Sequence, residues 1–275
     1  MTGVQTCALP ILSVTASRVN GTVRLTPSTG GLATGLARWC GDVEAVRIGW
    51  LGTSAALDSD LHGALESELA HLRVVPVHLS HDVVERYYHG FANRVLWPLF
   101  HYLIDRIPID ASGWDAYRAA NEHFADVVCR EYRPGDRIWI HDYQLILLPA
   151  LVRARLPTAR IGFFLHIPFP SFELFRLLPA PWRTEIIEGL LGASLLGFHT
   201  HDYGAHFLTS VLRTTGCEHQ LGALTLRDRV VKVAGPLSTN HGEVALDWAL
   251  QGKGIVLRFG RFHEITAPGL NWHIP

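Results

Sequence analysis

The sequence predicts an α/β protein with an open, mostly parallel sheet and helices on both faces. Strand-like segments alternate with helical periods along most of the 275 residues, and the segments at 137–141 and 160–166 are almost continuously apolar. Alternating strands and helices are typical of right-handed βαβ units. Continuously apolar strands are typical of parallel strands covered on both faces, so both observations indicate one doubly wound sheet.

The elements are expected in a regular order. Strand-like runs at 13–17 and 22–26 flank Asn20-Gly21, a dipeptide that tolerates the positive φ angles of a hairpin turn. The clearest helix is expected at 114–132, where apolar side chains recur at spacings of three, four and seven residues. The remaining strands are expected at 45–51, 72–79, 137–141, 160–166 and 194–199.

Composition excludes several classes of function. Hydrophobic residues make up 48% of the chain, and 24 basic residues balance 25 acidic ones, so we expect no nucleic-acid partner. The longest apolar runs are too short for a membrane span, and no signal-peptide pattern is present, so a cytoplasmic protein is expected. The four cysteines form no Cys-x-x-Cys pair, so no metal site is expected.

The two ends of the chain differ from the middle. Residues 1–11 show no periodic pattern and look like translated adapter sequence, so we interpret them as a leader that could be non-native. Residues 12–235 are assigned to the α/β domain, and residues 236–275 to a tail that could be chimeric. We expect both ends to pack poorly and to be trimmed first by proteases.

Polar residues follow three of the expected strands. They read His-Asp-Tyr at 141–143, His-Ile-Pro at 166–168 and His-Thr at 199–200. Ligands of doubly wound sheets bind beyond the carboxyl ends of the strands. One histidine at such a place is more often a structural hydrogen-bonding group, whereas three polar strand ends at one edge favour a pocket.

Two other features allow both a structural and a functional interpretation. Gly30-Gly31 precedes a helical stretch, and it is either a flexible turn or a loop whose backbone amides approach a phosphate or sugar. Tyr87-Tyr88 and Trp97 lie in an aromatic-rich segment, and alone they would be interpreted as core residues.

Several long motifs resemble those of the trehalose-6-phosphate synthase family. They lie in family order within residues 12–215 and read TPSTGGLATGL, YYHGFANRVLWPLFHY, WIHDYQLILLPALVRARLP, RIGFFLHIPFPSFELFRLLP and IIEGLLGASLLGFHTHDYGAHFL. The resemblance implies the amino-terminal half of a GT-B fold, in which two Rossmann-like halves enclose the active site. It also implies transfer of glucose from UDP-glucose to glucose 6-phosphate with retention, giving trehalose 6-phosphate without a metal or other cofactor.

The resemblance implies substrate-binding roles for two glycines and two aromatic residues in the first hundred residues of the chain. Gly30 and Gly31 match the donor-side glycine loop of the family. Tyr88 and Trp97 match aromatic residues that shape the glucose-6-phosphate pocket. Aromatic rings provide rigid and partly apolar walls for one face of a sugar.

The resemblance also implies two residues that both bind substrate and act in catalysis. Asp142 matches a carboxylate that binds acceptor hydroxyls, and His166 matches a histidine that contacts the donor sugar near the reacting centre. Retaining transfer through an oxocarbenium-like state requires accurate sugar placement and stabilisation of charge.

Two departures from the family pattern affect these expectations. The family opens with a strand and Ser-Asn-Arg-Leu-Pro, whose arginine holds the acceptor phosphate, whereas here MTGVQ precedes Thr-Cys-Ala-Leu-Pro and Ala8 replaces the arginine. The diphosphate-binding second half is not recognised, and the tail instead shows a short resemblance to effector domains of LysR-type regulators. We therefore expect a damaged sheet and a chain that is inactive alone.

Three alternatives remain at this point. A related synthase with another acceptor, such as glucosylglycerol-phosphate synthase, would share most of the motifs. A non-catalytic sugar-phosphate-binding fragment would bind glucose 6-phosphate without turnover. A regulator effector domain is disfavoured because the tail covers little of such a domain. The sequence leaves open a homo-oligomer, the donor nucleotide and the exact acceptor.

Overall fold

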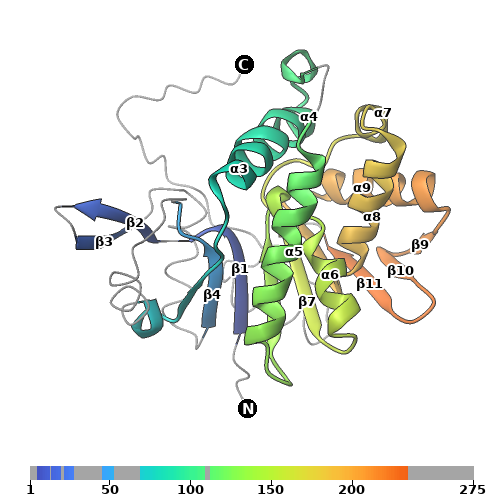
Figure 1. Cartoon of the computed structure of the whole chain (residues 1–275). Helices are drawn as coiled ribbons and strands as arrows, with labels where there is room; N and C mark the ends of the chain where they lie inside the picture. The colour runs from blue at the N-terminus through green and yellow to red at the C-terminus, as the bar shows by residue number, and fades with distance from the viewer. Residues whose placement is uncertain are drawn as a thin grey trace.

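The structure, a computed structural model, describes residues 5–12, 14–19, 22–27, 45–52, 69–108 and 112–234. Its strands are β1 (Gln5–Ile11), β2 (Val14–Val19), β3 (Thr22–Pro27), β4 (Ala45–Trp50), β5 (Val74–Pro76), β6 (Arg137–His141), β7 (Arg160–Leu165), β8 (Leu195–Phe198), β9 (His219–Gln220), β10 (Ala223–Thr225) and β11 (Val230–Ala234). Within the described residues, nine strands form one sheet in the order β5-β4-β1-β6-β7-β8-β11-β10-β9, and β2 pairs with β3 separately (Figure 1).

The helical elements connect and cover these strands. They are α3 (His81–Val84), η1 (Glu85–Leu96), α4 (Trp97–Phe100), η2 (Ile104–Arg106), α5 (Trp114–Glu131), η3 (Tyr143–Leu145), α6 (Leu148–Arg155), α7 (Phe172–Phe175), α8 (Ala180–Leu191) and α9 (His201–Thr215). Strands β6, β7, β8 and β11 are parallel neighbours in the sheet, and they are added in one direction along it, with β9 and β10 between β8 and β11 in the chain. Right-handed crossovers therefore place α6, α8 and α9 on one face. Figure 1 shows α5, α6 and α8 in front of the sheet.

The fold class predicted from the sequence, an open and mostly parallel sheet with helices on both faces, is confirmed. The expected hairpin is present as β2 and β3, although its turn residues lie outside the described part of the chain. The strand expected at 72–79 is shorter, because only Val74–Pro76 pairs with β4. The predicted tail, residues 236–275, also lies outside the described residues.

The expectation that residues 1–11 pack poorly is wrong for the part that the structure describes. Residues 5–11 form β1, which lies between β4 and β6 and is parallel to both. Cys7 and Ala8 are fully buried, and Leu9 is almost fully buried. The segment has no strand-like alternation because both faces of a central parallel strand are covered, so its pattern of small and apolar residues fits the centre of the sheet.

A continuous helical segment, α3 to α4, carries the aromatic-rich sequence. Its middle part, η1, is π-helical, and the N–H of Trp97 donates to the carbonyl of Ala92 five residues earlier. A Cβ at position 90 would lie only 2.9 Å from the carbonyl oxygen of Glu85. Gly90 avoids this close contact because it has no side chain. π-Helical segments are rare and often occur at functional sites.

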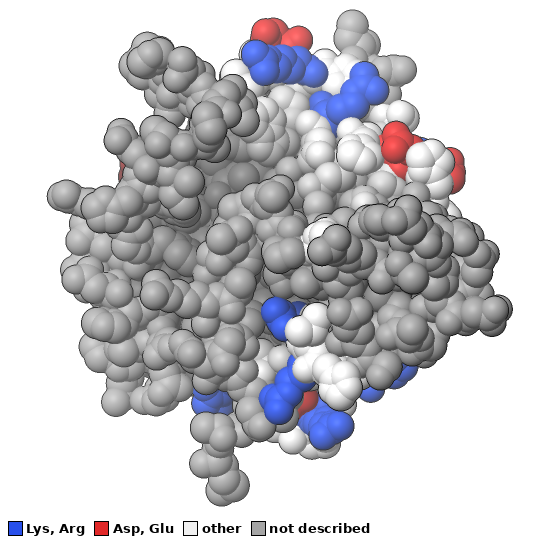
Figure 2. Space-filling view, turned by 90° about the vertical axis from the view of Figure 1, so that its left-hand side faces the viewer, with Lys and Arg blue, Asp and Glu red and all other residues white. Residues whose placement is uncertain are grey.

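Charged residues of both signs lie at the described surface (Figure 2). On the face in Figure 2, basic and acidic side chains of the described residues lie close together at the upper and lower edges. Arg86, for example, contacts both Asp82 and Asp115. None of the helices in the described ranges is both long enough and apolar enough to cross a membrane.

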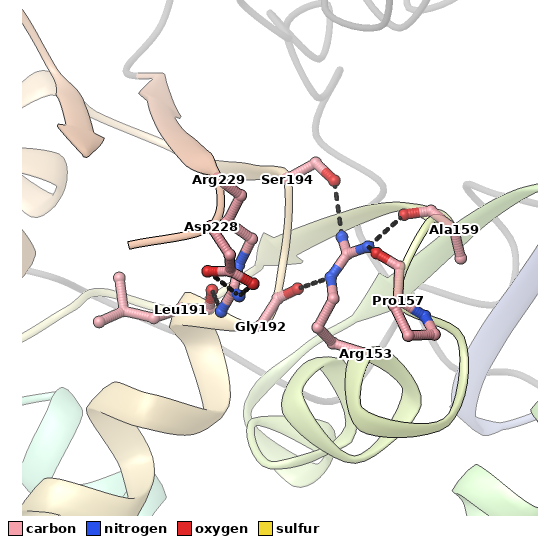
Figure 3. Close-up of polar contacts among 8 residues, drawn as sticks. All are labelled: Arg153, Pro157, Ala159, Leu191, Gly192, Ser194, Asp228 and Arg229. Atoms are coloured by element: carbon pink, nitrogen blue, oxygen red, sulfur yellow. Dashed lines mark hydrogen bonds and ion pairs between the residues drawn. The ribbon is translucent and has the colours of Figure 1, made fainter. Parts of the chain in front are cut away.

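At the amino ends of the central strands, two guanidinium groups join the loops (Figure 3). Arg153 on α6 donates to the carbonyls of Gly192, Pro157 and Ala159 at 3.1, 2.8 and 2.7 Å, and to the Ser194 hydroxyl at 2.8 Å. Arg229 donates to the Leu191 carbonyl at 3.0 Å and to the carboxylate of Asp228. We call Arg153 and Arg229 the arginine clamp.

Candidate functional site

The carboxyl ends of β6, β7 and β8 bring three histidines together. The strand register pairs His141 with Phe164 and Leu165 with Phe198, so the residues after each strand meet at one edge. Nδ1 of His141 lies 2.9 Å from Nε2 of His166. The ring centroids of His166 and His199 are 5.9 Å apart, and the ring of His199 is hydrogen-bonded to the backbone of His166. We call His141, His166 and His199 the histidine cluster.

Asp142 follows β6 in an unusual backbone conformation. Its φ is 74° and its ψ is 168°, a region that non-glycine residues rarely occupy and that costs about 1–3 kcal/mol. Its N–H donates to the Phe164 carbonyl at 2.9 Å, and its Oδ1 accepts from the backbone N–H groups of Tyr143 at 3.0 Å and His166 at 3.2 Å. The surrounding contacts therefore hold the carboxylate beside His166.

Burial sets the protonation of this group of residues. It raises the pKa of Asp142 to about 7, against the opposing effect of the two backbone hydrogen bonds. Burial lowers the pKa of His141 to about 3, and it lowers the pKa of His166 well below its usual value, with smaller effects from His141 and His199. Near neutral pH the two imidazoles are uncharged, while Asp142 is close to its midpoint. Shifted pKa values of this kind are frequent at functional sites.

Tyr88 connects the aromatic segment to this edge of the sheet. The half-buried Tyr88 hydroxyl is hydrogen-bonded to Asn93, and Oδ1 of Asn93 accepts a 2.7 Å hydrogen bond from the Tyr143 hydroxyl. The ring of Tyr88 also packs against Trp50, with centroids 5.8 Å apart. Tyr88 therefore lies near Asp142, and its predicted role in a sugar-phosphate pocket stays a prediction.

The other predicted site residues are placed differently. Trp97 is half-buried, and its ring stacks on His101 with centroids 4.1 Å apart, so its predicted role in a sugar pocket stays a prediction. Gly30 and Gly31 lie outside the described residues, and their roles also stay predictions. Ala8 is buried in β1 between its sheet neighbours in β4 and β6, where it offers a methyl group and no cation.

Sequence reasoning missed three residues that support the site. Asn93 had no signal, because one polar residue in a helical segment is ordinary. Tyr143 and His141 stood beside Asp142 in the sequence, but only the sheet register shows that His141 contacts His166. Within the described ranges, no three His, Cys, Asp or Glu side chains could hold a metal ion together.

Comparison with known proteins indicates the family. The family model described as glycosyltransferase family 20 matches residues 5–250, so the match includes β1. The bifunctional trehalose-6-phosphate synthase/phosphatase of Thermoproteus tenax is 44% identical over 215 residues, 75% of this chain and 29% of that protein. Alpha,alpha-trehalose-phosphate synthase (UDP-forming) A of Dictyostelium discoideum is 42% identical over 215 residues, 78% of this chain and 28% of that protein. The chain thus spans less than a third of the length of these two curated relatives.

Solved structures share the fold. The N-terminal domain of Candida albicans trehalose-6-phosphate phosphatase matches with a TM-score of 0.70 at 30% identity, over 90% of this chain and 51% of that chain. An alpha,alpha-trehalose-phosphate synthase (UDP-forming) from Burkholderia xenovorans, solved in complex with glucose 6-phosphate, matches with a TM-score of 0.67 at 26% identity. That match covers 91% of this chain and 53% of the Burkholderia chain.

Proposed function

Because the chain belongs to glycosyltransferase family 20, we propose that it carries the acceptor-side part of a trehalose-6-phosphate synthase site. The reaction proposed for the complete site is transfer of glucose from UDP-glucose to glucose 6-phosphate with retention. The observation that carries the proposal is the contact between Asp142 and His166. The buried carboxylate of the strained Asp142 accepts a hydrogen bond from the backbone N–H of the partly buried His166. The names of the Dictyostelium and Burkholderia relatives support this donor and acceptor.

The proposed roles follow from the chemistry of each group. Asp142 binds acceptor hydroxyls, because a carboxylate accepts several hydrogen bonds and this one is already oriented by two N–H groups. Uncharged His166 contacts the donor sugar and exchanges hydrogen bonds with its hydroxyls. Tyr88 and Trp97 form walls of the sugar-phosphate pocket, and Gly30 and Gly31 allow the donor to approach the backbone.

We propose that turnover requires groups outside the part of the family that this chain matches. The chain spans only 28–45% of the length of its curated relatives, and Ala8 supplies no charge to an acceptor phosphate. The purified chain with UDP-glucose and glucose 6-phosphate should therefore release no UDP above background. Protein-dependent UDP release that scales with chain concentration would overturn this part of the proposal.

Binding tests the site itself. We expect glucose 6-phosphate to perturb the NMR signals of the chain around Asp142 and His166, and Asp142→Asn to weaken binding about tenfold or more, as for loss of one charge-assisted contact. Arg155→Met is the matched control, because Arg155 is exposed on α6 and pairs with Asp126 away from the site. Equal weakening by both variants, or binding unaffected by Asp142→Asn, would show that the site is misplaced.

One observation bears against turnover and so favours a second candidate, a non-catalytic protein that binds a sugar phosphate through its sugar hydroxyls. Ala8 replaces the arginine that the family resemblance assigns to the acceptor phosphate, and its methyl group is fully buried. A synthase for another acceptor, such as glycerol 3-phosphate, would share this site. Competition of glucose 6-phosphate with glycerol 3-phosphate in the same NMR titration separates these acceptors. The cytoplasmic location and the homo-oligomer remain proposals as well.

A further inference from the structure

His141 is a buried histidine that the proposed function does not use. It is fully buried at the end of β6, and its ring stacks on Trp139 with centroids 4.9 Å apart. Its Nδ1 lies 2.9 Å from Nε2 of His166, and its other nitrogen, Nε2, has no hydrogen-bond partner among the described residues. One ring nitrogen of His141 thus contacts a substrate-binding candidate, and the other is buried without a described hydrogen-bond partner.

This arrangement selects one protonation pattern. A hydrogen bond between two neutral imidazoles needs one N–H donor and one bare nitrogen. If His141 carried its proton on Nε2, a buried N–H would lack an acceptor, which costs more than a bare nitrogen without a donor. The proton of His141 therefore belongs on Nδ1, from which it is donated to Nε2 of His166. His166 must then carry its own proton on Nδ1.

We infer that His141 is a positioning residue that fixes the tautomer and ring orientation of His166 through the hydrogen bond from its Nδ1 to Nε2 of His166. The backbone of His166 is held separately, since its N–H donates to Asp142 and its backbone is hydrogen-bonded to the ring of His199. The contact from His141 therefore decides that Nε2 of His166 is an acceptor. That choice determines whether a sugar hydroxyl accepts or donates a hydrogen bond at His166. The consequence for sugar binding rests on the proposed function, whereas the tautomer does not.

Two substitutions at His141 separate a positioning role from simple packing. In His141→Asn the side-chain amide overlays the Nδ1 position and can still donate to His166. In His141→Gln the amide overlays the Nε2 position, and the donor to His166 is lost. Both variants place one uncharged amide in the same buried site, so they form a matched pair.

The first measurement is the ¹⁵N spectrum of histidine-labelled full chain at neutral pH, with the His166 signals assigned by their loss in His166→Gln. We expect wild type and His141→Asn to show a bare Nε2 and a protonated Nδ1 on His166. In His141→Gln the two nitrogens should shift toward a mixture of both tautomers. A protonated Nε2 on His166 in the wild-type chain would overturn the inference, whether or not either variant folds. An unchanged His166 tautomer in folded His141→Gln would overturn it as well.

The second measurement is the affinity of the same chains for UDP-glucose and for glucose 6-phosphate. We expect His141→Gln to weaken UDP-glucose binding about tenfold, and His141→Asn to restore it to within about threefold of wild type. Glucose 6-phosphate binding should change less in both variants. If wild type binds neither sugar, the proposed function fails, and the spectrum still decides the tautomer. If wild type binds UDP-glucose and His141→Gln does so equally well, the positioning role fails.

Discussion

The two ends of the same parallel strands are held in opposite ways. At the amino ends, the arginine clamp uses charged guanidinium groups, and all three nitrogens of Arg153 donate to loop oxygens. At the carboxyl ends, His141 and Asp142 are buried, and the other two histidines of the cluster are partly buried. All four groups have shifted pKa values, the backbone of Asp142 is strained, and Nε2 of His141 has no described partner. All three nitrogens of Arg153 thus have partners, although the buried Nε of Arg229 has none among the described residues. The carboxyl ends instead combine the strained backbone of Asp142 with a buried ring nitrogen of His141 that lacks a described partner.

This difference separates stability from function within one sheet. Satisfied hydrogen bonds at a loop junction stabilise the fold and leave nothing for a ligand. Strain and incomplete satisfaction destabilise the fold unless surrounding contacts compensate for them, and they concentrate at functional sites. Substitutions at the amino ends should therefore reduce stability, and suitable substitutions at the carboxyl ends should change protonation or relieve strain.

The largest effect is expected for Arg153→Met. The variant keeps the apolar part of the side chain and removes four hydrogen bonds, leaving loop carbonyls before β7 and β8 without their donor. We expect the free energy of unfolding to fall by about 2–5 kcal/mol, measured by urea denaturation. Arg155→Met on the same helix should cost less than about 1 kcal/mol, because its pair with Asp126 is exposed. Equal losses in the two variants would remove the contrast between the two ends.

A smaller effect is expected in the pH dependence of stability. The pKa of Asp142 is about 7 in the folded chain and about 3.9 in an unfolded chain, so the folded state binds more protons between these values. Its contribution to stability is therefore present below pH 4 and is lost as the pH rises through 7. The lowered pKa of His141 acts in the opposite direction, because its neutral form is favoured in the fold and stability from it is lost as the pH falls below 6.5.

Asp142→Asn isolates the carboxylate from the histidines. The histidine contribution is present in both proteins and cancels in their difference. Between pH 5 and pH 8, wild type should lose on the order of 2–3 kcal/mol of unfolding free energy relative to Asp142→Asn. Urea denaturation at both pH values measures this change. If the difference in unfolding free energy between the two proteins did not vary with pH, burial would not raise the pKa of Asp142 in the folded chain.

The sequence predicted most of the sheet, because apolar periodicity reports local burial. The strand at 137–141 was predicted at its observed bounds. The helix predicted at 114–132 begins where α5 begins and ends one residue after α5 ends. The expectation of poor packing was wrong for residues 5–11, since a central strand without apolar alternation has no distinctive local pattern. Its place in the sheet depends on pairing with β4 and β6, which lie far along the chain.

The candidate site could be predicted only in part for the same reason. Asp142 and His166 stood out because each follows an apolar strand. The contact between His141 and His166 depends on the register of β6 and β7, and the shared partner Asn93 comes from a π-helical segment. The positive φ of Asp142 had no sequence signal at all, because aspartate does not require it.

The smallest and most specific effect concerns that φ angle. Glycine adopts φ near 74° and ψ near 168° freely, whereas alanine is strained there, so Asp142→Gly should be more stable than Asp142→Ala by about 1–2 kcal/mol. Both variants lose the same two hydrogen bonds from the carboxylate, so the difference reports only the backbone. Asp136 provides the matched control, because it is also buried and its carboxylate accepts from the backbone N–H of Arg133 at 2.8 Å, but its φ is not positive. There the order should reverse, with Asp136→Ala more stable than Asp136→Gly by about 0.5–1 kcal/mol, since glycine gains more entropy in the unfolded chain. Urea denaturation of the four variants measures both differences. If alanine were the better replacement at both positions, Asp142 would be unstrained. The contrast between the fully bonded Arg153 at the amino ends and the strained Asp142 at the carboxyl ends would then lose its main support.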